Sequence, residues 1–118
     1  MMKLTVTSSQ FDVVVVPFPF TDSKATKKRP ALIVSDATAF NNATGKSVMA
    51  MITTASHPSW SLNVPILDLK SAGLKAKFIV RMKLFTLDNA LVVKKIGKLA
   101  TKDSNNVKNA LQSLLSFD

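Results

Sequence analysis

The pattern of apolar and polar residues along the chain predicts mostly β-strands. An unbroken run of valines spans 13–16, and Pro-Phe-Pro-Phe follows it at 17–20. Such a run is typical of a strand buried on both faces, and prolines end it because proline has no N–H for a neighbouring strand. Further apolar runs predict strands at 30–35, 47–55, 62–66 and 78–87. Pro65 interrupts one of these runs and favours an edge strand there.

Polar segments and turn residues separate these runs. Residues 21–28 have no apolar period and predict a loop, and a second loop begins at 56–59. Asparagine and glycine at 39–46, and Ser-Ala-Gly at 71–73, predict turns. The segment 91–95 suits either another strand or a short helix.

The C-terminal segment changes to a helical period. Thr101 or Ser104 is expected to cap the start of a helix, and Asp103 suits the positive end of its dipole. One helical face carries Val107, Ala110, Leu111, Leu114, Leu115 and Phe117. Short strands closed by one helix favour a mainly β chain with short helices, forming a single small curled barrel over residues 1–118.

Composition narrows the chemistry. The 118 residues include no cysteine and one histidine, His57, which excludes disulfides, a thiolate nucleophile and multi-histidine metal sites. The formal net charge is +9, and all seven acidic residues are aspartates. A small domain this basic attracts polyanions, meaning nucleic acid, an acidic protein or an anionic membrane surface. The alternative is a solvated lysine-rich surface that only aids solubility.

Nothing in the sequence predicts a membrane protein. No apolar run approaches the ~20 residues that cross a bilayer. Residues 1–10 lack the long apolar run of a signal peptide. We therefore expect a cytoplasmic location.

The basic residues around 24–29 form one candidate anion site. Lys24, Lys27 and Lys28 lie in the predicted loop, and Pro30 biases Arg29 toward an extended backbone. An arginine held at a loop–strand junction can present its planar fork to a phosphate in two-point contact. An ordinary solvated basic loop is the competing interpretation.

Three further groups offer polar chemistry. The hydroxyls of Thr53 and Thr54 end a buried strand, where they can bond either a phosphate oxygen or the backbone. Arg81 and Lys83 share one face of their strand because residues i and i+2 do so, and two cations there favour solvent or a ligand. His57 is the only side chain that ordinarily titrates near neutrality, although loop histidines are common.

Some catalytic devices are missing from the sequence. It has no carboxylate cluster of the kind that holds Mg²⁺ and no glycine-rich phosphate loop. We therefore expect neither metal nor another cofactor. Cleavage of a phosphodiester would then use the 2′-hydroxyl of RNA as the nucleophile, with side chains that move protons and cations that stabilise the phosphorane.

Several blocks of the sequence, which contain Arg29, Thr53 and Arg81, resemble the PemK/MazF family of toxin–antitoxin ribonucleases. Arg-Pro at a strand start and Ile-Thr-Thr at a strand end form the more specific pair. The blocks occur in family order at 11–22, 28–35, 52–54, 80–88 and 96–99.

The resemblance implies an SH3-like or plasmid-maintenance-toxin barrel that cleaves single-stranded RNA sequence-selectively without metal. It matches Arg29 to the catalytic arginine, Thr53 to the hydroxyl residue that assists it, and Arg81 to a second catalytic arginine of some members. It also implies an antitoxin that blocks the site, and a homodimer. From the net charge of +9 we expect this antitoxin to be acidic and to cover Arg29 and Arg81. Met49, Met51 and the C-terminal helix offer apolar surface for that dimer.

The sequence departs from the family pattern at two positions. Lys83 stands where some members carry an aspartate proposed as general base, so Asp22, Lys83 and His57 all remain candidates for the base. Phe11 replaces the usual glycine before the first strand, which is expected to affect the start of that strand. Two alternatives stay open: a non-enzymatic gyrase poison on the same fold, and a nucleic-acid-binding module that has lost cleavage.

Overall fold

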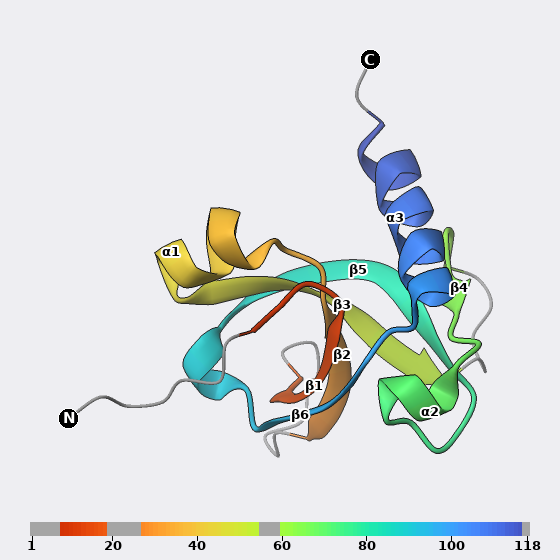
Figure 1. Ribbon diagram of the computed structural model, residues 1–118, viewed down its shortest axis with the longest axis horizontal. Coiled ribbons are helices and arrows are strands. Elements are labelled where there is room, and N and C mark those ends of the chain that lie inside the picture. The colour runs from red at the N-terminus through yellow and green to blue at the C-terminus, as the bar shows by residue number, and fades with distance from the viewer. Residues whose placement is uncertain (1–7, 19–26, 55–59, 117–118) are drawn as a thin grey trace.

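Six strands form one antiparallel sheet that curls into a half-barrel (Figure 1). The computed structural model describes residues 8–18, 27–54 and 60–116. Across the sheet the strands run in the order β4-β5-β3-β2-β1-β6. Their bounds are β1 Asp12–Pro17, β2 Lys28–Ile33, β3 Lys46–Thr54, β4 Val64–Pro65, β5 Phe78–Asp88 and β6 Lys94–Lys98. The prediction of a small, mainly β barrel with a C-terminal helix is confirmed.

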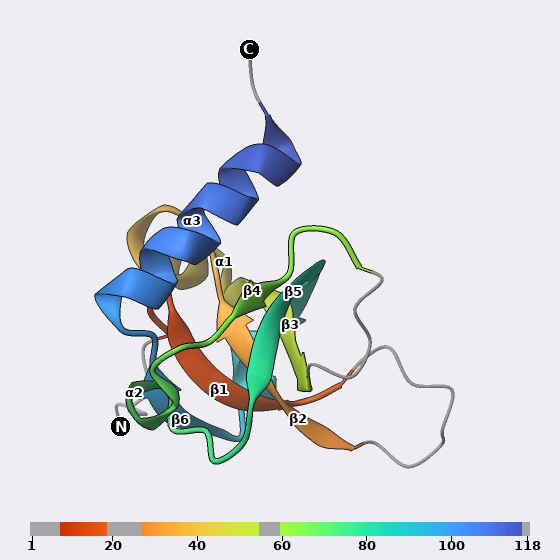
Figure 2. The same cartoon turned by 90° about the vertical axis from the view of Figure 1, so that its right-hand side faces the viewer.

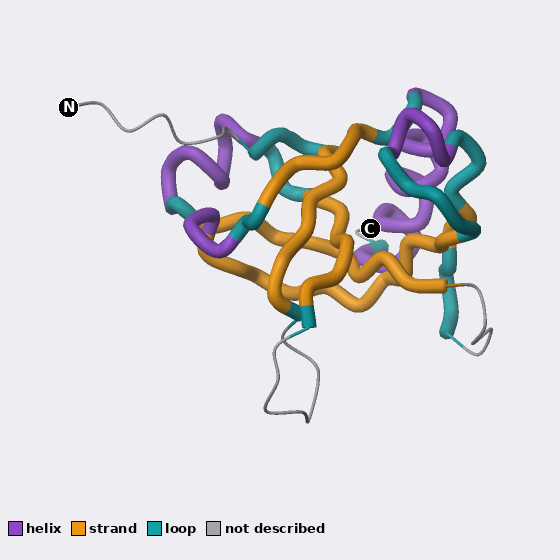
Figure 3. The backbone as a smooth tube through the Cα atoms, turned by 90° about the horizontal axis from the view of Figure 1, so that it is seen from below, coloured by secondary structure: helices purple, strands orange, loops and turns teal. Residues whose placement is uncertain are grey.

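Helical segments lie at the two ends of the sheet (Figure 3). They are the π-helix η1 Ala37–Asn41, α1 Asn42–Thr44, α2 Leu69–Ala72, the 3₁₀-helix η2 Asn89–Leu91 and α3 Thr101–Leu115. The first turns of α3 pack on the sheet, and its C-terminal end rises clear of the body (Figure 2). Val107 is accordingly fully buried, whereas Leu114 and Leu115 are exposed.

The sheet buries both of its faces. One core contains Leu32, Ala50 and Val80, and α2 and α3 cover it through Ala72 and Val107. We call this the helix-side core. The second core lies on the opposite face of the sheet and contains Val14, Val16, Phe18, Ala31, Ile33, Met49 and Phe85. Because both faces are apolar, the valine run of β1 needs no polar alternation, as its sequence indicates.

A bulge shapes the middle of β5. Ala50 pairs with Leu84, but the next residue, Met51, pairs with Arg81, so Met82 and Lys83 are inserted into β5. An insertion of two residues preserves the alternation of side chains. Arg81 and Lys83 therefore share a face, as predicted, and that face is the one that carries the second core.

Several boundaries differ from the sequence predictions. β2 begins at Lys28 rather than Pro30, because Lys28 and Arg29 pair with Pro17 and Val16 of β1. Pro30 fits within this strand although proline lacks an N–H. The turn expected at 71–73 is instead the end of α2, with Gly73 in the left-handed conformation after it. The turn expected at 39–46 holds η1 and α1, and the loop at 56–59 lies outside the described residues.

The start of α3 differs from the predicted cap. Its N-cap residue is Ala100, which makes no side-chain capping bond, so the expectation for Thr101 or Ser104 is wrong. Asp103 lies in the first turn, as expected, but is 1% exposed. Its carboxylate accepts hydrogen bonds from the backbone N–H groups of Leu67 and Asp68, at 2.9–3.1 Å. Asp103 thus ties α3 to the chain before α2.

The start of β1 is unusual, in line with the departure at Phe11. Its φ of 70° lies in the left-handed region that favours glycine. The ring is buried in the helix-side core, and Lys108 of α3 lies over it at 5.6 Å. Burial of an aromatic ring offsets the backbone strain here.

Candidate active site

Arg29, Thr53 and Arg81 come from neighbouring strands and meet at one end of one sheet face. Ala31 of β2 pairs with Met51 of β3, which pairs with Arg81 of β5. Arg29 lies two residues before Ala31, and Thr53 lies two residues after Met51. Since β2 and β3 are antiparallel, both steps run toward the same end of the sheet and keep the same face. The three predicted catalytic residues therefore lie together.

Arg29 is oriented by an aromatic ring. Its guanidinium carbon lies 5.8 Å from the centroid of the Phe18 ring. Phe18 is buried and meets the ring of Phe85 edge to face, with 6.2 Å between centroids. The buried Nε of Arg29 has no hydrogen-bond partner among the described residues. A cation–π contact fixes the guanidinium without a counter-charge, so its charge stays available for an anion.

Arg81 and Lys83 add two cations from β5 to the sheet face that carries Arg29. Both side chains are half-buried. The Arg81 guanidinium carbon and the Lys83 Nζ lie 5.7 and 5.8 Å from the centroid of the Trp60 ring. Trp60 is itself 43% exposed. Two cations and one exposed indole thus share a surface beside the arginine–threonine group.

The remaining described candidates surround this group. Thr53 is half-buried opposite Ile79, and Thr54 is exposed opposite Phe78. Lys27 and Lys28 are exposed at the start of β2. Asp22, Lys24 and His57 lie outside the described residues.

The aspartates within the described segments all serve structural roles. Each accepts a backbone hydrogen bond near a turn or a helix start, and two also form ion pairs. These residues are Asp12, which pairs with Lys95 at 3.2 Å, Asp36, Asp68, Asp88, which pairs with Lys46 at 3.7 Å, and Asp103. In the described part of the chain, no three histidine, cysteine or acidic side chains gather where a metal ion could bind.

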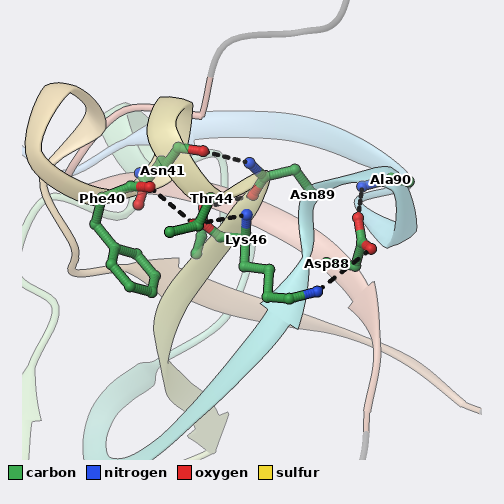
Figure 4. A network of polar contacts seen from close by, with 8 residues as sticks. Phe40, Asn41, Thr44, Lys46, Asp88, Asn89 and Ala90 are labelled. Atoms are coloured by element: carbon green, nitrogen blue, oxygen red, sulfur yellow. Dashed lines mark hydrogen bonds and ion pairs between the residues drawn. The ribbon is translucent and has the colours of Figure 1, made fainter.

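A separate pocket of about 540 Å³ lies at the other end of the sheet, between α1 and the start of β6. A polar network closes one side of it (Figure 4). Ser47 donates to Asn89 at 2.6 Å, and the Asn89 amide donates to the Asn41 carbonyl at 3.3 Å. None of the predicted site residues lines this pocket. The network holds the η1–α1 segment against the end of β5.

Two residues that support the site had no predicted role. Phe18 was part of a recognisable block, but only the fold shows that its ring lies against Arg29. Trp60 follows the second predicted loop and carries no periodicity that would place it. Its one signal is that it is the only tryptophan, in a chain without tyrosine, and lies in a polar segment.

Solved structures define the class of this fold as that of the MazF toxins. The chain superposes on MazF from Deinococcus radiodurans with a TM-score of 0.73 and 21% identity, covering 95% of this chain and 99% of that one. For the MazE–MazF complex of the same organism the TM-score is 0.75 and the identity 19%, covering 96% of this chain and 100% of that one. For a mycobacterial endoribonuclease solved with its cognate antitoxin the TM-score is 0.72 and the identity 19%, covering 94% of this chain and 97% of that one.

The sequence gives a family assignment that the low structural identities alone would not. A family model for the PemK-like, MazF-like toxins of type II toxin–antitoxin systems matches residues 9–115. The chain belongs to this family. A search of curated proteins finds no match. No helix within the described segments is long and apolar enough to span a bilayer.

Proposed function

We propose that this toxin is a metal-independent, sequence-selective endoribonuclease that cleaves single-stranded RNA. The observation that carries the proposal is the meeting of Arg29, Thr53 and Arg81 at one end of one sheet face. Two guanidinium groups and a hydroxyl suit a transition state whose charge lies on phosphate oxygens. The name of the mycobacterial relative, an endoribonuclease, supports the same activity.

The chemistry balances without an external co-reactant. The 2′-oxygen of the ribose attacks the adjacent phosphorus, and the bond from phosphorus to the 5′-oxygen breaks. A base removes the 2′-proton and an acid protonates the leaving 5′-oxygen, which leaves a 2′,3′-cyclic phosphate and a 5′-hydroxyl. In this scheme Arg29 stabilises the phosphorane, Thr53 holds a phosphate oxygen, and Arg81 acts as the acid or as a second clamp.

The base is drawn from Asp22, Lys83 and His57. The aspartates of the described segments already accept structural hydrogen bonds, which favours a base that is not one of them. Lys83 lies beside Arg81 and Trp60, where a cation suits phosphate binding. Lys24, Lys27, Lys28 and Thr54 would bind the RNA on either side of the scissile bond.

An acidic antitoxin is the proposed protein partner. The chain carries +9, and Lys83 lies on the same sheet face as Arg29 and Arg81. The solved relatives bound to antitoxins support such a partner. We propose that a disordered acidic segment folds across this surface and blocks RNA.

A two-fold homodimer in the cytoplasm completes the proposal. The expectation that Met49 offers apolar surface for the dimer is wrong, because Met49 is fully buried in the second core. Met51 is half-buried against the same core. The free end of α3 is the better surface, since Leu114 and Leu115 are 40% and 54% exposed. Light scattering at micromolar concentration tests the dimer.

Incubation of the protein with a long RNA tests the proposed activity. Discrete fragments with 5′-hydroxyl ends are expected, and Arg29→Ala should produce them about 10²–10³-fold more slowly. Intact RNA together with inhibited DNA supercoiling would instead identify a gyrase poison. Intact RNA that is nevertheless bound would identify a binding module without catalysis.

A further inference from the structure

Trp60 combines three properties that the cleavage chemistry does not use. It is the only tryptophan, and its indole is 43% exposed. Both Arg81 and Lys83 contact its ring, at 5.7 and 5.8 Å from the centroid. The indole therefore leaves part of its ring surface open beside two cations, where a further aromatic group can meet it.

The position of the ring relates it to the proposed cut. Arg81 and Lys83 lie on the face that carries Arg29 and Thr53, so the indole borders the same surface. Cations beside an aromatic ring suit a nucleotide, because the phosphate meets the cations while the base meets the ring. An acidic peptide would use the cations and leave the indole without a partner.

We propose that Trp60 is the base-stacking residue of this toxin, and that it takes the nucleobase next to the scissile phosphate. This inference rests on the proposed RNA cleavage and adds a determinant of substrate selection to it. Arg81 and Lys83 hold the indole through cation–π contacts and bind the phosphate that follows the stacked base. Trp60 is thus a specificity residue and takes no part in proton transfer.

Kinetics separate stacking from catalysis. Stacking is the same in the bound substrate and in the transition state, so its loss raises KM and leaves kcat nearly unchanged. Trp60→Leu, which keeps apolar volume but removes the aromatic ring, should raise KM about 10–100-fold, as expected for one base–aromatic contact. Trp60→Phe should recover most of this loss. Leu67→Ala is the control, since Leu67 is also an exposed apolar side chain but lies beside Lys70 and Lys102 and not among the cations that contact Trp60.

Because Trp60 is the only tryptophan, its fluorescence reports directly on contact between the indole and a bound base. The probe is a short RNA with a single 2′-deoxyribose at the cut site, which binds without being cleaved. It should quench the Trp60 fluorescence. An otherwise identical RNA that lacks the base next to the scissile phosphate should bind about 10–100-fold more weakly and quench little. Poly-aspartate, which offers charge without bases, should bind without quenching.

The outcomes distinguish this inference from the proposed function. Equal quenching by the abasic RNA or by poly-aspartate, or unchanged KM and cleavage pattern in folded Trp60→Leu, overturns the stacking role while cleavage stands. Base-dependent quenching in a wild-type protein that cuts no RNA supports stacking and overturns cleavage. A wild-type protein that binds no RNA overturns both.

Discussion

Arg29 shows how one side chain is prepared for an anion by its neighbours. The ring of Phe18 lies 5.8 Å from the guanidinium carbon, and Phe85 of the second core supports that ring. Among the described residues, the orientation depends on apolar packing, and no carboxylate forms an ion pair with Arg29. A paired carboxylate would neutralise the charge that the proposed chemistry needs.

Removing this guanidinium should slow cleavage without unfolding the protein. Arg29→Ala is expected to lower the single-turnover rate about 10²–10³-fold, the usual cost of losing one donor to a developing oxyanion. Arg29→Lys keeps the charge but not the two-pronged fork, so it should recover only part of the rate. Lys94→Ala, which removes an exposed charge from β6, is the control and should cut normally. A full rate in Arg29→Lys would contradict the two-point contact.

Lys83 tests whether the family departure changes the mechanism. We expect it to bind phosphate, so Lys83→Met should weaken RNA binding and reduce the slope of log affinity against log salt by about one. The single-turnover rate at saturating RNA should stay close to wild type. If Lys83 is instead the base, that rate will fall as far as it does in Arg29→Ala.

At the scale of elements, much of the sheet could be predicted from the sequence. The valine run and the long run after residue 78 have patterns that few other structures satisfy. The residues from 69 to 72 and from 37 to 44 misled the prediction, because segments of three to five residues carry no helical period. Their helical form depends on capping bonds from Asp68 and Asp36.

The site was predictable only in part. Arg29, Thr53, Arg81 and Lys83 were named from local motifs and a resemblance, but their meeting depends on strand order and on the two-residue bulge of β5. Neither the strand order nor the bulge can be predicted from a local sequence pattern, because register depends on pairing between segments that are distant in the sequence. The contacts of Phe18 and Trp60 were out of reach for the same reason.

The packing of α2 against β6 gives a test of the fold itself. A Cβ atom on Gly97 would lie 2.3 Å from the backbone carbon of Ala72 and 2.6 Å from the carbonyl oxygen of Ser71. Backbone atoms cannot move aside, so Gly97→Ala should lower the free energy of unfolding by about 1–3 kcal/mol. Urea denaturation measures the loss.

A matched glycine separates crowding from backbone strain. Gly45 has a φ of 73° and open space around its Cα, so Gly45→Ala should lose only the cost of a left-handed alanine, about 1 kcal/mol. Wild-type stability in Gly97→Ala would show that α2 does not pack closely on β6.

For the whole molecule, net charge governs the encounter with a partner. Attraction between +9 and an acidic antitoxin is screened over about 8 Å at physiological ionic strength. The association rate should therefore fall steeply as salt rises, while the dissociation rate changes less. Stopped-flow mixing at several salt concentrations measures both. An association rate independent of salt would argue against an antitoxin that binds the cationic face.

The central claim is that the toxin cuts RNA with the substrate's own 2′-hydroxyl. Its most direct test compares two RNAs in the presence of EDTA, one all-ribose and one with a single 2′-deoxyribose at the cut site. We predict that the first is cleaved to a 2′,3′-cyclic phosphate and that the second is bound almost as tightly but stays intact, since most affinity comes from phosphates. Cleavage of the deoxy substrate, or loss of all cleavage in EDTA, would contradict the claim.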